Sequence, residues 1–134
     1  MEYSIKASST AKNSASIRIK QSDISFGITP NTAETLASPA ELFLGAFSSC
    51  VLKNVERFSS FMKFEYSRAE ITVEAKRLEK PPRMDELNYV LTIYSNDKHL
   101  NVDLLKKNIE KHGTIYNTVV LSCSIVGEIH VISE

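Results

Sequence analysis

The sequence predicts an α+β domain in which antiparallel sheets surround one central buried helix. Three features support this class. The N-terminal third alternates between apolar and polar residues, the middle carries a long apolar stretch with a helix-capping signal, and the last half alternates again before a second helix and a closing strand. With 134 residues the chain is long enough to bury its own core, and we expect a single domain over 1–134.

Three short antiparallel strands are expected before residue 29. Apolar side chains recur there at every second position, and polar turn residues interrupt the pattern at 12–14 and 22–23. The alternating apolar residues are Tyr3, Ile5, Ala7, Ile17, Ile19, Ile24, Phe26 and Ile28. The next segment, 29–37, contains Pro30 and Asn31 and is expected to form a loop.

A capping signal marks the start of the central helix. Ser38 suits the N-cap, Pro39 the first helical position and Glu41 the third, which together form a capping box. We expect this helix to continue to about Met62. Its first half is apolar or small on every face, which is typical of a helix that is buried all round.

Two strands, a helix and a last strand are expected after the central helix. Residues 69–75 and 87–93 alternate on either side of a proline-containing turn, which predicts an antiparallel pair. Asn101 suits the N-cap of a second helix. The β-branched run 114–121 is ambiguous, and we interpret it as one or two helical turns. A strand over 123–132 closes the chain.

Charge and hydropathy exclude several classes of function. Lysine plus arginine and aspartate plus glutamate both total 16, so no net charge draws the protein to nucleic acid or anionic lipid. The N-terminal residues lack the apolar stretch of a signal peptide, and the longest uncharged apolar run, 42–52, is far too short to span a bilayer. We therefore expect a soluble, cytoplasmic protein with no nucleic-acid or membrane partner.

Cys50 is the principal candidate for a catalytic group. It shares one stripe of the central helix with Phe43, Phe47 and Asn54. A thiolate there would be a nucleophile, but free cysteine is also among the most buried residue types and packs like a small hydrophobe. The residues alone leave both interpretations open. Cys123 is expected to pack on the apolar face of the last strand, so the two cysteines should not form a disulfide.

Other titratable candidates also have structural explanations. Glu41 is a candidate catalytic carboxylate, although the capping box already accounts for it. His112 lies near the apolar stripe of the second helix, where a packed or half-exposed histidine is more common than a base. His99 and His130 have no cysteine or carboxylate at metal-ligand spacing, and no glycine-rich phosphate loop is present. We therefore expect neither a metal nor a cofactor.

The order of elements and the motif around Cys50 resemble the OsmC/Ohr family of thiol-dependent hydroperoxide reductases. The motif comprises Ser38-Pro39-Ala40-Glu41-Leu42-Phe43, then Gly45-Ala46 and Ser48-Ser49-Cys50. The resemblance implies an intertwined homodimer whose two cysteine-bearing helices pack together, with active sites at the subunit interface. The residues that it implies are Cys50 and Glu41 as catalytic groups, and Phe43, Phe47, His112 and Gly113 in the substrate pocket.

The chain also departs from the family pattern in two places. Peroxidases of the family carry a second cysteine at the start of the final helical segment, and Gly113 occupies that position here. They also pair an arginine with a glutamate ten residues before the reactive cysteine, where this chain has Ala40, with Glu41 as its neighbour. No arginine clearly takes the place of the partner.

Two functions follow from the resemblance. In the first, Cys50 reduces organic hydroperoxides in an oxidative stress response, and an external thiol replaces the missing resolving cysteine. In the second, the same dimer holds a small apolar ligand beside Cys50 without turnover. A packed, unreactive Cys50 is the third interpretation. Fast alkylation and sulfenate trapping indicate the first function, whereas slow alkylation and a retained apolar ligand indicate the second.

Overall fold

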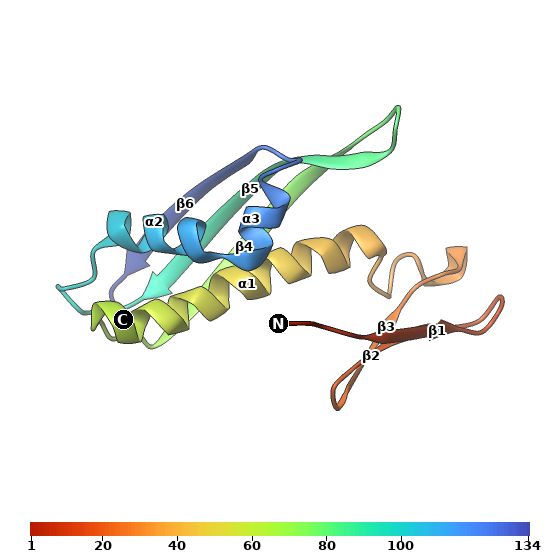
Figure 1. The fold of residues 1–134 in the computed structure, drawn as a ribbon, viewed down its shortest axis with the longest axis horizontal. Helices are drawn as coiled ribbons and strands as arrows, with labels where there is room; N and C mark the ends of the chain where they lie inside the picture. Colours follow the sequence, from red (N-terminus) through yellow and green to blue (C-terminus); the bar gives the residue numbers. More distant parts are fainter. The chain divides into compact units, whose positions relative to one another are not determined.

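The computed structural model describes all 134 residues, and its contacts divide the chain into two compact units. Met1–Phe43 form the first unit and Leu44–Glu134 the second. The long helix α1 begins in the first unit and continues through the second. Figure 1 shows the order of the elements along the chain, coloured from the N-terminus to the C-terminus.

The first unit contains the three predicted antiparallel strands, which are β1 (Lys6–Ser9), β2 (Ala15–Ile19) and β3 (Ser22–Phe26). They form one sheet in which β2 pairs antiparallel with both neighbours. The pattern extended these strands too far, because Tyr3, Ile5 and Ile28 lie outside them. The predicted loop also contains a single turn of 3-10 helix, η1 (Pro30–Thr32).

The bounds of α1 (Pro39–Met62) agree with the prediction. The Ser38 amide donates to the Glu41 carboxylate at 3.0 Å, and the Glu41 amide donates to the Ser38 hydroxyl at 3.2 Å. Both halves of the capping box therefore form, which satisfies two amides that would otherwise have no partner in the helix. No helix of the protein combines the length and the apolar character needed to cross a membrane.

Burial of α1 is confined to one stripe in the single chain. We expected its first half to be covered on every face, but Gly45, Ala46 and Ser49 are exposed. The sheet and the two shorter helices of the second unit cover only one side of α1, so the other side has no cover there. The buried residues of α1 are Phe47, Val51, Asn54, Val55 and Phe58.

The second unit contains a three-stranded sheet in the order β4-β5-β6. β4 (Arg68–Leu78) and β5 (Arg83–Tyr94) form the predicted antiparallel pair. The predicted all-antiparallel arrangement is wrong for the last strand, because β6 (Ile125–Ile132) runs parallel to β5. The helices α2 (Val102–His112) and α3 (Thr114–Val119) lie between these strands and carry the chain back, as a parallel connection requires.

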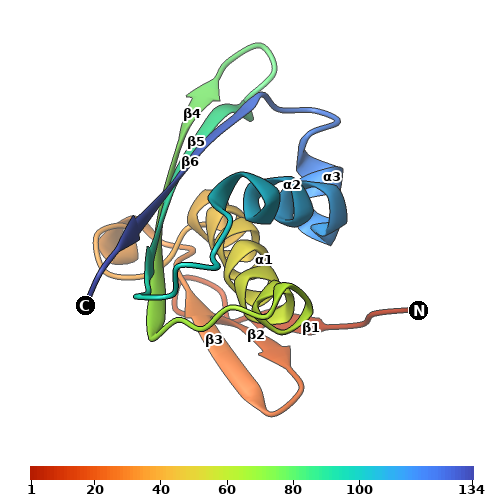
Figure 2. The same ribbon diagram turned by 90° about the vertical axis from the view of Figure 1, so that its left-hand side faces the viewer.

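The core of the second unit lies between the sheet and its helices. In Figure 2, α1 and α2 lie on the same face of the β4-β5-β6 sheet. Alternate side chains of β5 point into this layer and are at most 2% exposed; they are Leu87, Tyr89, Leu91 and Ile93. Leu105 and Ile109 of α2 meet them with at most 1% exposure. Full burial of each such side chain contributes about 2 kcal/mol to folding.

Candidate functional site

Cys50 lies on α1 beside the junction between α2 and α3. Its side chain is half-buried, and Gly113 at the junction is buried. A Cβ built on Gly113 would lie 3.6 Å from the Cys50 sulfur, which is ordinary van der Waals contact. The chain positions that the family resemblance links are therefore neighbours in space.

Gly113 is at this junction because of close contacts rather than backbone conformation. Its φ of −74° and ψ of 113° are extended values that any residue adopts. A Cβ there would, however, lie 2.8 Å from the Ile109 carbonyl oxygen and 3.0 Å from the Tyr116 Cβ. A side chain at 113 requires the junction to shift, so glycine both fits the space and leaves the Cys50 sulfur facing bare backbone.

Three aromatic rings pack against one another next to the Cys50 site. Phe47 is fully buried one turn before Cys50, and its ring centroid lies 5.9 Å from that of Tyr89 and 6.1 Å from that of Tyr116. Tyr89 is fixed at its other end, because its hydroxyl donates to the Glu110 carboxylate at 2.8 Å. Burial raises the pKa of Tyr89, and the bond to Glu110 raises it further, so this phenol stays protonated as a donor.

Tyr89 also explains a glycine in the last strand. A Cβ built on Gly127 would lie 2.0 Å from Cζ of the Tyr89 ring, so no side chain can occupy that position while the ring stays in place. The ring crosses β6 at Gly127 and reaches α2, where Lys106 lies 3.0 Å from the same Glu110 carboxylate. The layer of side chains beside Cys50 is thus held in place by Tyr89 of β5, Glu110 of α2 and Gly127 of β6.

Asn54 is the residue near Cys50 that sequence reasoning placed on the stripe without assigning a role. It is only 7% exposed, and its amide nitrogen lies 3.0 Å from the Cys50 carbonyl oxygen and 3.7 Å from the Cys50 sulfur. The available signal was its polarity, because the other buried residues of α1 are apolar. We name Cys50, Asn54, Gly113 and Tyr116 together the thiol junction.

The remaining predicted site residues are Glu41, Phe43 and His112. Glu41 and Phe43 belong to the first unit, and the Glu41 carboxylate is engaged in the helix cap. The Ser38 backbone amide that bonds to this carboxylate lowers the pKa of Glu41. His112 is exposed, and its ring packs 5.5 Å from that of Phe58, about two helical turns beyond Cys50.

Cys123 has a structural role in the second unit. It lies in the turn before β6 and not within the strand, which corrects the predicted strand boundary. The residue is buried, and its thiol donates to the Met84 carbonyl oxygen at 3.2 Å. Both cysteines are free, as expected. No group of three histidine, cysteine or acidic side chains is placed to hold a metal ion.

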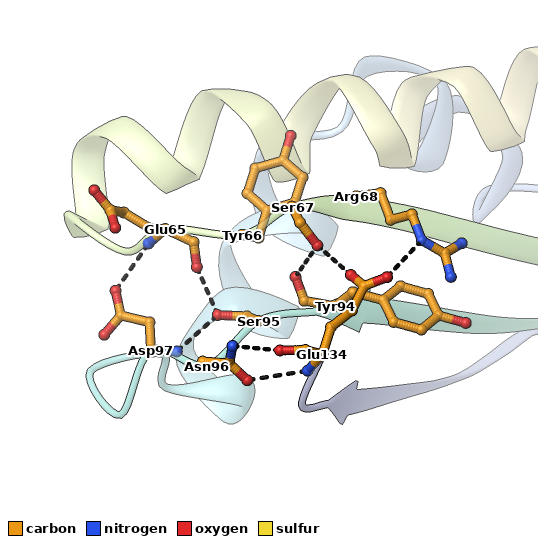
Figure 3. Close-up of a pocket in the computed structure, with 9 residues that line it drawn as sticks. All are labelled: Glu65, Tyr66, Ser67, Arg68, Tyr94, Ser95, Asn96, Asp97 and Glu134. Atoms are coloured by element: carbon orange, nitrogen blue, oxygen red, sulfur yellow. Dashed lines mark hydrogen bonds and ion pairs between the residues drawn. The ribbon is translucent and has the colours of Figure 1, made fainter.

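A surface depression lies at the ends of the strands of the second unit, and Cys50 is not among its lining residues (Figure 3). Ser67 and Arg68 both donate to the Glu134 carboxylate, and the Glu134 backbone exchanges two hydrogen bonds with the Asn96 side chain. These groups are satisfied by one another and leave no converging set for a ligand. We name this set the strand-end cluster: Glu65, Tyr66, Ser67, Arg68, Tyr94, Ser95, Asn96, Asp97 and Glu134.

Comparison with known proteins identifies a family and several structures of similar fold. The family model described as OsmC-like protein matches residues 31–127. An OsmC-like protein from Mycoplasma pneumoniae has a similar structure, with a TM-score of 0.86, 17% identity, and coverage of 98% of each chain. None of the curated proteins matches the sequence.

Two solved structures of organic hydroperoxide resistance proteins have the same fold. The one from Legionella pneumophila has a TM-score of 0.68 and 12% identity, with 96% of this chain and 98% of that chain covered. The one from Elizabethkingia anophelis, with thiocyanate bound, has a TM-score of 0.73 and 11% identity, with 98% and 99% covered. At these identities the structural similarity shows a shared fold and nothing further.

Proposed function

This chain belongs to the family of OsmC-like proteins, and from that premise we propose that it reduces organic hydroperoxides through Cys50. The observation that carries the proposal is the position of the Cys50 sulfur. It is half-buried beside Gly113, with a side-chain amide 3.7 Å away. Structures of similar fold include proteins named for organic hydroperoxide resistance, which supports the choice of substrate.

The proposed reaction begins with attack by the Cys50 thiolate on the terminal oxygen of the hydroperoxide. A sulfur–oxygen bond forms as the oxygen–oxygen bond breaks, and the departing alkoxide takes up a proton and leaves as an alcohol. Cys50 is oxidised to a sulfenic acid, and the hydroperoxide is reduced by two electrons. The step needs no metal or organic cofactor.

An external thiol must complete the cycle, because the chain has no second cysteine placed to resolve the sulfenic acid. Cys123 is buried against the Met84 carbonyl, and position 113 is a glycine. One thiol attacks the sulfenic sulfur, releases water and forms a mixed disulfide with Cys50. A second thiol then attacks this disulfide, which regenerates the Cys50 thiol and releases the oxidised reductant.

The test compares wild type with variants of each cysteine in a peroxide-consumption assay with cumene hydroperoxide and excess dithiothreitol. We expect wild type to consume peroxide, Cys50→Ser to be inactive, and Cys123→Ser to retain activity, since serine still donates to the Met84 carbonyl. A dimedone probe should label Cys50 alone after one equivalent of peroxide. Equal, background rates for wild type and Cys50→Ser would contradict the proposal, and a retained apolar ligand in that case would support binding without turnover.

We also propose that the protein works as a homodimer. The exposed side of α1 in the single chain carries small residues at Gly45, Ala46 and Ser49, which allow another helix to approach closely. β6 adds apolar surface, with Val126 62% and Ile132 46% exposed. Exposed apolar side chains and small residues that allow close approach are common at subunit interfaces. Sedimentation equilibrium at micromolar concentration should give the dimer mass, and a clean monomer mass would contradict the proposal.

A further inference from the structure

We propose that Asn54 is a positioning residue that stabilises the thiolate of Cys50. The inference rests on the proposed function, and it names the group that activates the sulfur in that reaction. Asn54 follows Cys50 by one helical turn, so the two side chains lie on the same face of α1. Its amide nitrogen is the one side-chain donor within hydrogen-bonding range of the Cys50 sulfur.

The orientation of the Asn54 amide follows from its second partner. One end of the amide lies 3.0 Å from the Cys50 carbonyl oxygen, which is only an acceptor. The nitrogen must therefore face the carbonyl, because two oxygens at that distance would repel each other. The same nitrogen carries a second hydrogen, and the distance from this nitrogen to the Cys50 sulfur is 3.7 Å. One amide group is thus shared between the backbone oxygen and the sulfur of the same residue.

A buried amide is unusual on this otherwise apolar stripe of α1. Asn54 is 7% exposed and is one of only two buried polar residues, the other being Ser95 at the far end of β5. Its buried neighbours on α1 are all apolar, so leucine would suit the stripe for packing alone. A buried amide costs free energy unless it is hydrogen-bonded, and the bonds that compensate here are those to Cys50.

A donor to the sulfur favours the charged form of the thiol. Hydrogen bonds to an ionised group are about twice as strong as those between neutral groups. The bond therefore strengthens when the proton leaves, and it shifts ionisation toward the thiolate. No arginine or lysine of the same chain is bonded to the sulfur, and Asn54 is its side-chain donor within the chain. Titratable side chains on the elements around Cys50 include Lys53 and Arg57 of α1, Tyr89 of β5, Lys106, Glu110 and His112 of α2, and Tyr116 of α3.

The test measures the rate of iodoacetamide alkylation of Cys50 against pH, in a Cys123→Ser background. Asn54→Leu should raise the pH midpoint of alkylation by about one unit, which lowers the thiolate fraction about tenfold at pH values below the wild-type midpoint. Asn54→Asp keeps the shape of the side chain but replaces the donor with a carboxylate, so its midpoint should rise at least as far.

A matched control is available in the same unit. The amide nitrogen of Asn108 lies 3.5 Å from the sulfur of Met62, so this residue has a similar amide–sulfur contact away from Cys50. Asn108→Leu should leave the alkylation profile unchanged. A purely structural Asn54 would lower the melting temperature in Asn54→Leu without moving the midpoint, and that result would overturn the proposal. If Asn54→Leu does not fold, an unchanged midpoint in Asn54→Asp has the same meaning.

The alkylation readout is independent of peroxide reduction. A shifted midpoint in a protein without peroxidase activity would support the role of Asn54 while removing the proposed function. Peroxidase activity in wild type together with an unshifted alkylation midpoint in Asn54→Leu would support the proposed function and remove the role of Asn54. In a functional peroxidase, the second-order rate constant for cumene hydroperoxide below the alkylation midpoint should also fall about tenfold in Asn54→Leu.

Discussion

The strand-end cluster and the thiol junction lie in the same unit but use their polar groups in opposite ways. In the cluster, Glu134 accepts from Ser67 and Arg68, and its backbone is bonded to Asn96. At the junction one amide faces one sulfur, and Gly113 adds no side chain. A surface depression lies at the cluster, yet the donors and acceptors that line it are already paired. A reactive group with a single side-chain donor, rather than a surface depression, therefore marks the candidate site.

The largest expected effect tests how firmly the layer beside the thiol junction is fixed. Gly127→Ala places a methyl group 2.0 Å from Cζ of the buried Tyr89 ring, and the bond from Tyr89 to Glu110 opposes its movement. We expect the free energy of unfolding in urea to fall by about 1–3 kcal/mol. In a Tyr89→Leu background the same substitution should cost much less, because the clash is gone. Equal costs in both backgrounds would contradict this account.

Gly113→Cys tests the placement of the junction itself. A cysteine there directs its side chain at the Cys50 sulfur, so diamide should link the two residues, as seen by non-reducing mass analysis. The close contacts with Ile109 and Tyr116 should lower the free energy of unfolding of the reduced variant by about 1–2 kcal/mol. Gly113→Ser measures this cost without the bond. A folded variant that forms no such disulfide would show that the junction lies elsewhere.

Ser67→Ala should have a smaller effect, confined to the strand-end cluster. It removes an exposed hydrogen bond to Glu134, and exposed polar contacts of this kind contribute about 0.5 kcal/mol. The alkylation rate of Cys50 should be the same as in wild type, because Ser67 has no contact with the thiol junction. Denaturant titration and an alkylation time course check both statements. A slower alkylation would mean that the strand-end cluster and the thiol junction are coupled, which would contradict their independence.

The smallest expected effect is a pH dependence within the cluster. Burial, together with the hydrogen bond to Glu56, raises the pKa of Tyr66 to about 12. Since this pKa is higher in the folded state than in the unfolded one, the stabilisation is complete below about pH 10 and is lost as the pH rises through about 12. Tyrosinate absorbance should show late ionisation of several tyrosines, since the pKa values of Tyr89 and Tyr116 are raised as well, and Tyr66→Phe should remove the part near pH 12. Ionisation of all the tyrosines near pH 10 would contradict it.

Local signals in the sequence predicted much of the fold. The capping box located the start of α1, and alternation located β4 and β5, because both depend on residues close together in the chain. The parallel pairing of β6 was not predicted, since a strand alternates in the same way whichever direction its neighbour runs. The exposed side of α1 was missed for a related reason: composition does not say how much cover one chain provides.

The candidate site was predictable only in part. The resemblance drew attention to Cys50 and Gly113, and the structure brings these positions together. The resemblance does not indicate which side chain faces the sulfur, because in the sequence Asn54 is one more residue of the helix stripe. The bond from Tyr89 to Glu110 joins residues on different elements, and no local pattern indicates such a pair. Contacts of this kind depend on tertiary packing rather than on spacing along the chain.

The parallel pairing of β6 has a consequence for the order of folding. β4 and β5 are joined by a short turn, so they can pair early at little cost in loop entropy. β6 must wait until α2 and α3 have carried the chain back, because its partners on β5 are distant in sequence. Gly127 belongs to β6, so the Tyr89 ring can pack against it only after β6 has paired with β5. We therefore expect the surroundings of Cys50 to become complete late in folding, after β6 has paired with β5.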